Sequence, residues 1–237
     1  GTLIPDPDNA GVGNIRYVNR AQDQVIFDPA LFCVCVLPEN YFFMEVRKMK
    51  SYSHLKLRAL CEGALLVALA QVLGYIKLFE LPQGGSVCLS MLPIFIYCAR
   101  WGFGPGMLAS FAFSLLQLLL DGAYAFGWQS MLGDYIVAFT VLGLAGLFHG
   151  KKNGFFIGSV VGSAARFLVH YVVGATVWGE YMPDTFFGMT MTTPWFYSAL
   201  YNGSYMVLDL VICLVVGWLL WKPLGKYIRG EDIPAKA

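Results

Sequence analysis

The sequence predicts an all-α membrane protein, a bundle of six transmembrane helices with both termini in the cytoplasm. Of its 237 residues, 57% are hydrophobic and only 13% are charged, which is more apolar than a water-soluble domain of this length requires. The apolar residues gather in six runs, each near the roughly 20 residues that a spanning helix needs. Lysine and arginine cluster at the ends of these runs and are not spread along the chain.

The six runs set the expected helices in chain order. They cover residues 55–78, 86–100, 104–120, 131–148, 154–178 and 196–221, and the second and third are the shortest. Basic residues concentrate before the first run, after the last one and in two of the loops, where positive charge favours the cytoplasmic side. The other loops carry mostly acidic residues, so the sides alternate and an even number of spans is expected. The basic residues concerned are Arg47, Lys48, Lys50, Lys56, Arg58, Arg100, Lys151, Lys152, Lys222, Lys226, Arg229 and Lys236.

Polar and aromatic side chains interrupt three of the apolar runs. Ionisable groups in such segments cost free energy and therefore indicate function. At a rise of about 1.5 Å per residue, His170 and Asn202 lie about 10 to 12 Å below the outer ends of their helices, and the others lie in the same outer half. We therefore expect a ligand pocket open to the outside. Its members are Tyr124, Asp134, Tyr135, His170, Trp178, Tyr197 and Asn202.

Each member of this set also has a simpler interpretation. Tyrosine and tryptophan at helix ends commonly form interfacial belts. Asp134 fits a cap at the start of its helix, where a carboxylate favours the positive end of the helix dipole. His170 and Asn202 fit hydrogen bonds that join neighbouring helices.

Two further features lie outside this pocket. Arg166 and Asp209 are expected about 18 and 20 Å below the outer ends of their helices, so we predict a structural ion pair near the midplane. Ala64 and Ala68 stand four residues apart in the first run, which permits close approach of another helix. Their expected neighbour is either an intramembrane partner protein or another helix of the same bundle.

Several classes of function have no support in the sequence. The net charge of +1 gives no signal for nucleic acid. Cys33 and Cys35 are too few for a metal site, and no metal-ligand cluster, nucleotide-binding loop or nucleophile motif appears. We therefore predict no metal, no cofactor and no catalytic residue.

The stretch DYIVAFTVLGLAGLF from Asp134 to Phe148 resembles the thiamine-specific S component of energy-coupling factor transporters. His170 followed eight residues later by Trp178, and Tyr197 followed five later by Asn202, belong to the same resemblance, which covers about residues 55–228. Members are multi-pass proteins of the bacterial plasma membrane that capture thiamine. They deliver it through a transmembrane coupling subunit and two ATPase subunits, which use the ATP.

This resemblance implies a role for each residue. Trp178 would stack on thiamine, while His170, Tyr197, Asn202, Tyr124 and Tyr135 would contact it. Asp134 stands where the family usually has glutamate, and Phe113 stands where a tryptophan is expected. Ala64 and Ala68 would dock on the coupling subunit. The alternatives are an S component for a thiamine precursor or another vitamin and, more distantly, an intramembrane enzyme using Asp134 with His170.

The chain before the first run has a different character. Residues 1–48 lack helical periodicity and contain Pro5, Pro7, Pro29 and Pro38, so we expect a disordered extension beside a six-helix substrate-binding domain at 49–237. The segment LIPDPDNAGVGN, Leu3–Asn14, resembles a translation of the 3′ part of the thiamine pyrophosphate riboswitch. That resemblance implies a mis-annotated extension with Met49 as the true start.

Overall fold

The computed structural model describes residues 39–82, 84–121, 125 and 127–233, with side chains described from residue 54 onward. The chain divides into two units, Gly1–Lys50 and Ser51–Ala237, and the second unit is the helical body. Helix α2 covers Glu39–Tyr75, so helical structure begins before residue 49. Residues 1–38, and the predicted ligand-binding Tyr124, lie outside the described residues. The predicted division at residues 48 and 49 stays a prediction.

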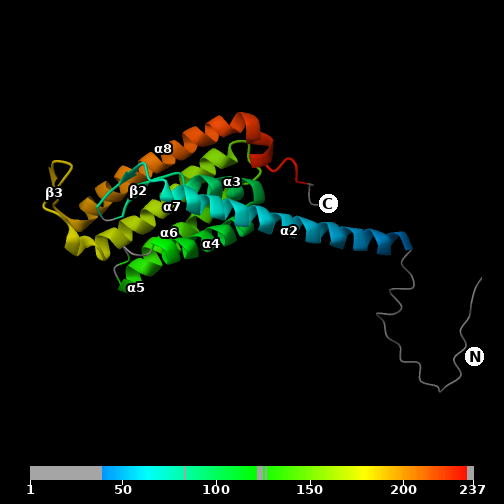
Figure 1. The fold of residues 1–237 in the computed structure, drawn as a ribbon, viewed down its shortest axis with the longest axis horizontal. Coiled ribbons are helices and arrows are strands. Elements are labelled where there is room, and N and C mark those ends of the chain that lie inside the picture. Colours follow the sequence, from blue (N-terminus) through cyan, green and yellow to red (C-terminus); the bar gives the residue numbers. More distant parts are fainter. Residues whose placement is uncertain (1–38, 83, 122–124, 126, 234–237) are drawn as a thin grey trace, which may run out of the picture. The chain divides into compact units, whose positions relative to one another are not determined.

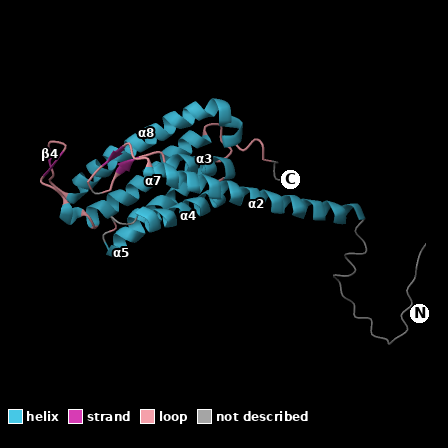
Figure 2. Cartoon of the chain, viewed as in Figure 1, coloured by secondary structure: helices cyan, strands magenta, loops and turns pink. Residues whose placement is uncertain are grey.

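The helical body is all-α apart from two small hairpins (Figure 1). After α2 come α3 (Met91–Trp101), α4 (Phe103–Asp121), α5 (Gly127–Ser130) and α6 (Ala138–Thr140), followed by α7 (Gly154–Thr176) and α8 (Pro194–Ile228). A π-helical segment, Met131–Val137, joins α5 to α6, and a 3₁₀ segment, Val141–Phe148, continues α6. Strands β1 (Phe79–Glu80) and β2 (Ser86–Val87) form one hairpin, and β3 (Thr185–Phe186) and β4 (Met189–Thr190) form the other. Figure 2 shows both hairpins toward the same end of the bundle as α5.

Five helical segments are long and apolar enough to cross a membrane. They are His54–Tyr75, Phe103–Asp121, Gly127–Phe148, Gly154–Thr176 and Pro194–Ile228, and α3 is a shorter apolar helix of 11 residues. All six predicted runs thus contain a helix, although their bounds differ. The second begins at Met91 and not at residue 86, because Ser86 and Val87 belong to β2. The last continues to Ile228 and not to residue 221.

The bundle carries apolar side chains on its outside and many polar ones within. Leu65 is 71% exposed, Leu119 77% and Trp218 62%, whereas Ser110, Ser114 and Ser159 are fully buried. A water-soluble protein rarely leaves so much contiguous apolar surface uncovered. This distribution fits a protein whose outer face meets lipid.

A group of charged side chains, the Arg100 cluster, closes the bundle at the end away from the hairpins. Arg100 is fully buried and donates from Nε to Glu62 (2.6 Å), from Nη1 to Asp232 (2.5 Å) and to the carbonyl oxygen of Tyr227 (2.7 Å). Its guanidinium also stacks on the Tyr227 ring at 3.7 Å. Arg58 donates to both carboxylates. These bonds tie α2, α3 and the segment after α8 to one another.

Candidate functional site

A cavity of about 140 Å³ opens among α2, α4, α5, α7, α8 and the β1–β2 hairpin. On the same measure one water molecule needs roughly 10–15 Å³, so the cavity can hold a molecule of about two rings. Six of the seven residues predicted to bind a ligand line it: Asp134, Tyr135, His170, Trp178, Tyr197 and Asn202. The bundle therefore brings residues from three separate predicted helices to one place.

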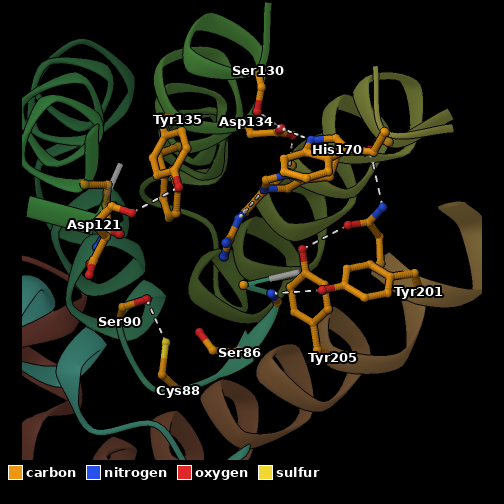
Figure 3. Close-up of a pocket in the computed structure, with 18 of the residues that line it drawn as sticks. Ser86, Cys88, Ser90, Asp121, Ser130, Asp134, Tyr135, His170, Tyr201 and Tyr205 are labelled. Atoms are coloured by element: carbon orange, nitrogen blue, oxygen red, sulfur yellow. Dashed lines mark hydrogen bonds and ion pairs between the residues drawn. The ribbon is translucent and has the colours of Figure 1, made fainter. Parts of the chain in front are cut away.

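Asp134 is the centre of the hydrogen bonding in this cavity. Its Oδ1 accepts from His170 Nδ1 at 2.9 Å, and its Oδ2 accepts from Ser130 Oγ at 2.7 Å and from Trp178 Nε1 at 3.0 Å. Figure 3 shows the carboxylate facing His170, with Ser130 above it in the view. The alternative in which Asp134 only caps a helix start is wrong, because the residue lies within the π-helical segment and bonds across to other elements. π-Helical turns are frequent at functional sites.

The bonds of His170 fix its tautomer. An ionised carboxylate only accepts hydrogen bonds, so Nδ1 must carry the proton that is donated to Asp134. Nε2 is then an acceptor, and Arg166 Nε donates to it at 3.4 Å. His170 is thus a neutral ring held between a carboxylate and a guanidinium.

Arg166 and Asp209 lie close together, with Arg166 Nη1 and Asp209 Oδ2 at 4.0 Å. Neither of these two atoms has a hydrogen-bond partner within the part of the chain that the structure describes. Asp209 Oδ1 accepts from the backbone N–H of Cys88 at 2.8 Å, and the Arg166 guanidinium lies 4.3 Å from the centre of the Phe139 ring. Arg166 also lines the cavity, which the sequence did not predict.

Asn202 joins α7 to α8 at the cavity wall. Its Nδ2 donates to the carbonyl oxygens of His170 (3.3 Å) and Ser198 (3.0 Å), and its Oδ1 accepts from Tyr205 Oη (3.0 Å). Gly174 permits this close packing, because a Cβ there would collide with Ser198. The interhelical bond considered for Asn202 is therefore present, and the amide oxygen retains one lone pair.

The aromatic residues supply flat apolar walls. Trp178 follows α7 and is half-buried, with its indole N–H directed to Asp134. Tyr197, Tyr201 and Tyr205 repeat at intervals of four on one face of α8, and neighbouring rings in this row lie 5.7 and 5.9 Å apart. Tyr135 donates its hydroxyl to the backbone oxygen of Asp121 at 3.0 Å.

The cavity lining carries as many carboxylates as cations. Lys77 and Arg166 are the cations that line it, and Asp121 and Asp134 are the carboxylates. Each cation already has an acidic partner outside the lining, Glu80 at 2.8 Å for Lys77 and Asp209 for Arg166. Asp134 bonds only neutral donors among the described residues, so its charge stays available to a cationic ligand.

Several lining residues were missed by the sequence reasoning. Ser130 precedes Asp134 by four residues, and Tyr201 and Tyr205 continue the spacing of Tyr197, so helical periodicity could have found these three. The β1–β2 hairpin could not have been found in this way, because it reaches the cavity only by folding back. There Gly85 donates its N–H to Tyr201 Oη at 3.1 Å, and a Cβ at Gly85 would lie 2.7 Å from the Tyr205 ring.

The small residues of α2 point in two directions. Gly63 and Ala70 are buried, and Gly63 packs on the Tyr97 ring. Ala64 and Ala68 are exposed together with Leu57, Leu60 and Leu65. The alternative in which Ala64 and Ala68 pack within the bundle is therefore wrong.

Comparison with known proteins assigns the chain to a family. Residues 60–228 match the model of the thiamine transporter protein family (Thia_YuaJ). This chain belongs to that family. Thiamine transporter ThiT of Bacillus subtilis is 33% identical over 187 residues, which cover 73% of this chain and 94% of that protein. ThiT of Lacticaseibacillus paracasei is 29% identical over 69% of this chain and 86% of its own length.

A solved structure agrees with this assignment. ThiT from Listeria monocytogenes superposes with a TM-score of 0.64 at 25% identity, covering 73% of this chain and 98% of that one. The predicted family is thus confirmed, and members of this transporter family are not enzymes.

Proposed function

We propose that this multi-pass membrane protein binds thiamine in the cavity around Asp134 and delivers it for uptake. The observation that carries the proposal is the Asp134 carboxylate, held by three neutral donors at the wall of the cavity. Membership of the thiamine transporter family supports the choice of ligand.

The chemistry of thiamine matches the side chains of this cavity. Its thiazolium ring is a permanent cation, which both a carboxylate and an aromatic face attract. Its aminopyrimidine is a flat ring with donors and acceptors on its edge, suited to a place between aromatic walls that carry a few directional polar groups. Asp134 and Trp178 supply the charge and the face, and Tyr197, His170 and Asn202 supply the polar edge.

The proposed topology has six spans with both termini in the cytoplasm. Helix α3 is the sixth span, although its 11 residues extend only about 16 Å at 1.5 Å per residue. The basic side chains Arg58, Arg100, Lys151, Lys152 and Lys226 belong to segments at one end of the bundle, and the cavity opens toward the other end. The positive-inside tendency places the basic end in the cytoplasm and the cavity outside.

Delivery would require partner proteins. We propose that the exposed Ala64 and Ala68 on α2 dock against a transmembrane coupling subunit of an energy-coupling factor module. Small residues let two helices approach closely within a bilayer, and this face is uncovered in the bundle. Two ATPase subunits of the module would hydrolyse ATP, so this chain itself would need no cofactor.

Calorimetric titration of the purified protein with thiamine tests the proposal. We expect saturable binding of one thiamine per chain, with weaker binding of the separate pyrimidine and thiazole fragments because each makes only part of the contacts. Tighter binding of the pyrimidine fragment than of thiamine would favour a transporter of a precursor. Absence of heat from all three ligands would contradict the proposal.

A further inference from the structure

A second cavity lies at the opposite end of α7 from the Asp134 site. It measures about 180 Å³ and is bordered by the turn before α7 and by the end of α8. Along α7, the residues that line the first cavity run from Arg166 to Gly174, about 18 to 30 Å from Gly154 at 1.5 Å per residue. Gly154 and Gly174 are thus about one hydrocarbon thickness apart, so the two cavities open toward opposite membrane surfaces.

Cations dominate the lining of this second cavity. Lys151, Lys152 and Arg229 line it, with Glu231 as its only carboxylate among the described residues. Arg229 Nε donates to Glu231 at 2.5 Å, which leaves the charges of the two lysines uncompensated within the lining.

Aromatic rings hold two of the cations in place. The Lys151 ammonium lies 4.9 Å from the centre of the Phe148 ring, and the Arg229 guanidinium lies 5.1 Å from that of Trp221. A cation over an aromatic face keeps N–H donors free at its edges. Both cations can therefore still bind an anion.

The start of α7 adds further positive potential. This helix of 23 residues begins at Gly154, whose N–H donates to the carbonyl oxygen of Lys151 at 2.9 Å, and the side chain of Asn153 does not cap the next N–H groups. The first N–H groups of a helix have no intrahelical acceptor, and its dipole is positive at this end. The lysines and the helix start therefore favour the same kind of ligand, a phosphate group.

The surroundings of the cavity suit a lipid better than a free anion. Phe155, Trp221 and Ile228 give it apolar walls. Farther from this end, Ile157 on α7 is 43% exposed and Trp218 on α8 is 62% exposed. A bound phosphate would thus have an apolar surface next to it along which acyl chains can lie.

We propose that this second cavity binds the phosphate headgroup of an anionic glycerophospholipid in the cytoplasmic leaflet. The leaflet rests on the orientation given under Proposed function, whereas the binding of the headgroup does not. Basic pockets between transmembrane helices on that side suit such headgroups. A lipid bound in this cavity would contact both the start of α7 and the end of α8.

Native mass spectrometry of the protein released from bilayers of equal phosphatidylglycerol and phosphatidylcholine content tests the proposal. We expect the wild type to retain one phosphatidylglycerol. The double variant Lys151→Gln/Lys152→Gln should reduce that retention about thirty-fold, because two cations near the headgroup are lost. The matched control is Lys222→Gln/Lys226→Gln, which removes two exposed lysines near the same end that do not line the cavity. It should change retention by less than about two-fold.

Three results would overturn the proposal: equal losses in both double variants, no loss in the cavity variant, or displacement of the lipid by millimolar inorganic phosphate. Thiamine titration of both variants shows whether they are folded, since none of the four lysines lines the Asp134 cavity. A wild type that retains phosphatidylglycerol but does not bind thiamine would refute the proposed function and leave the lipid site standing.

Discussion

The two ends of the bundle differ in what surrounds a charged side chain. At each end a charged side chain, fully buried for Arg100 and partly buried for Asp134, is held by several hydrogen bonds from different elements. Arg100 meets two carboxylates, a backbone carbonyl and an aromatic face, and its side chain is fully buried. Asp134 meets three donors as well, yet it borders a cavity.

The difference shows which buried charges are structural and which are functional. A charge enclosed by protein partners serves to hold structural elements together. Its removal leaves the partner charges without compensation, which destabilises the fold. A charge that faces a cavity keeps acceptor capacity for a ligand. The Arg100 cluster should therefore control stability, and the Asp134 cluster should control binding.

Removal of Arg100 should have the largest effect. Arg100→Ala removes the buried one of the two arginines that Glu62 and Asp232 share, and it should reduce the free energy of unfolding by about 3–5 kcal/mol. Thermal unfolding in detergent measures this loss. Lys222→Ala, an exposed cation near the same end, is the control and should change stability by less than about 0.5 kcal/mol. Equal stability of Arg100→Ala and Lys222→Ala would contradict the proposal that the Arg100 cluster controls stability.

Removal of the Asp134 charge should weaken binding without comparable unfolding. Asp134→Asn should raise the thiamine Kd roughly ten- to a hundred-fold, because a hydrogen bond to a charged group contributes about 1.5–3 kcal/mol. Tryptophan fluorescence quenching measures the affinity. Asp184→Asn removes an exposed carboxylate that does not line the cavity, and it should leave the Kd unchanged. An unchanged Kd in Asp134→Asn would remove this carboxylate from the site.

Loss of the Trp178 ring should have a smaller effect on binding. Trp178→Leu removes an aromatic face worth about 0.5–2 kcal/mol to a cation, so the thiamine Kd should rise between about two-fold and thirty-fold. Calorimetry suits this variant, because its main fluorophore near the cavity is gone. Trp128→Leu changes a tryptophan on α5 that is 67% exposed, and it should bind as the wild type does. Equal Kd values for the two variants would argue against stacking on Trp178.

Asp232 should show the smallest effect, and one that depends on pH. Its hydrogen bonds to Arg100 hold the pKa of its carboxyl below the ordinary value. The stabilisation is therefore complete above the ordinary pKa of about 4 and is lost as the pH falls through the lower folded value. Because the side chain is 40% exposed, Asp232→Asn should cost about 0.2–1 kcal/mol at pH 7. Unfolding curves of the variant and the wild type should converge in acid, and a constant difference down to pH 2 would contradict this assignment.

Hydropathy predicted the number and order of the helices but not their ends. It finds the part of a helix that lies in lipid, so it missed the polar last turns of α8, where Lys222 and Lys226 lie before Ile228. It also could not predict that Met131–Val137 would be π-helical, because that form depends on how Asp134 and Tyr135 bond across the bundle.

The distance of each residue below the outer end of its helix, its depth, predicted most residues of the candidate site. Depth placed His170 and Asn202 at one level, because both lie in regular α-helices, and it placed Asp134 in the same outer half. Depth alone could not predict which face of a helix turns inward, so Ser130 and Tyr205 were missed. It also placed Arg166 only as a partner of Asp209, whereas its second contact, with His170, depends on side-chain geometry.

A crystal structure of the protein with thiamine bound tests the central claim most directly. The claim is that the cavity around Asp134 is the thiamine site. We expect density for one thiamine in that cavity, with the Asp134 carboxylate within hydrogen-bond distance and the Trp178 ring against one of its two rings. Thiamine bound elsewhere, or an empty cavity in crystals grown at saturating thiamine, would contradict the claim.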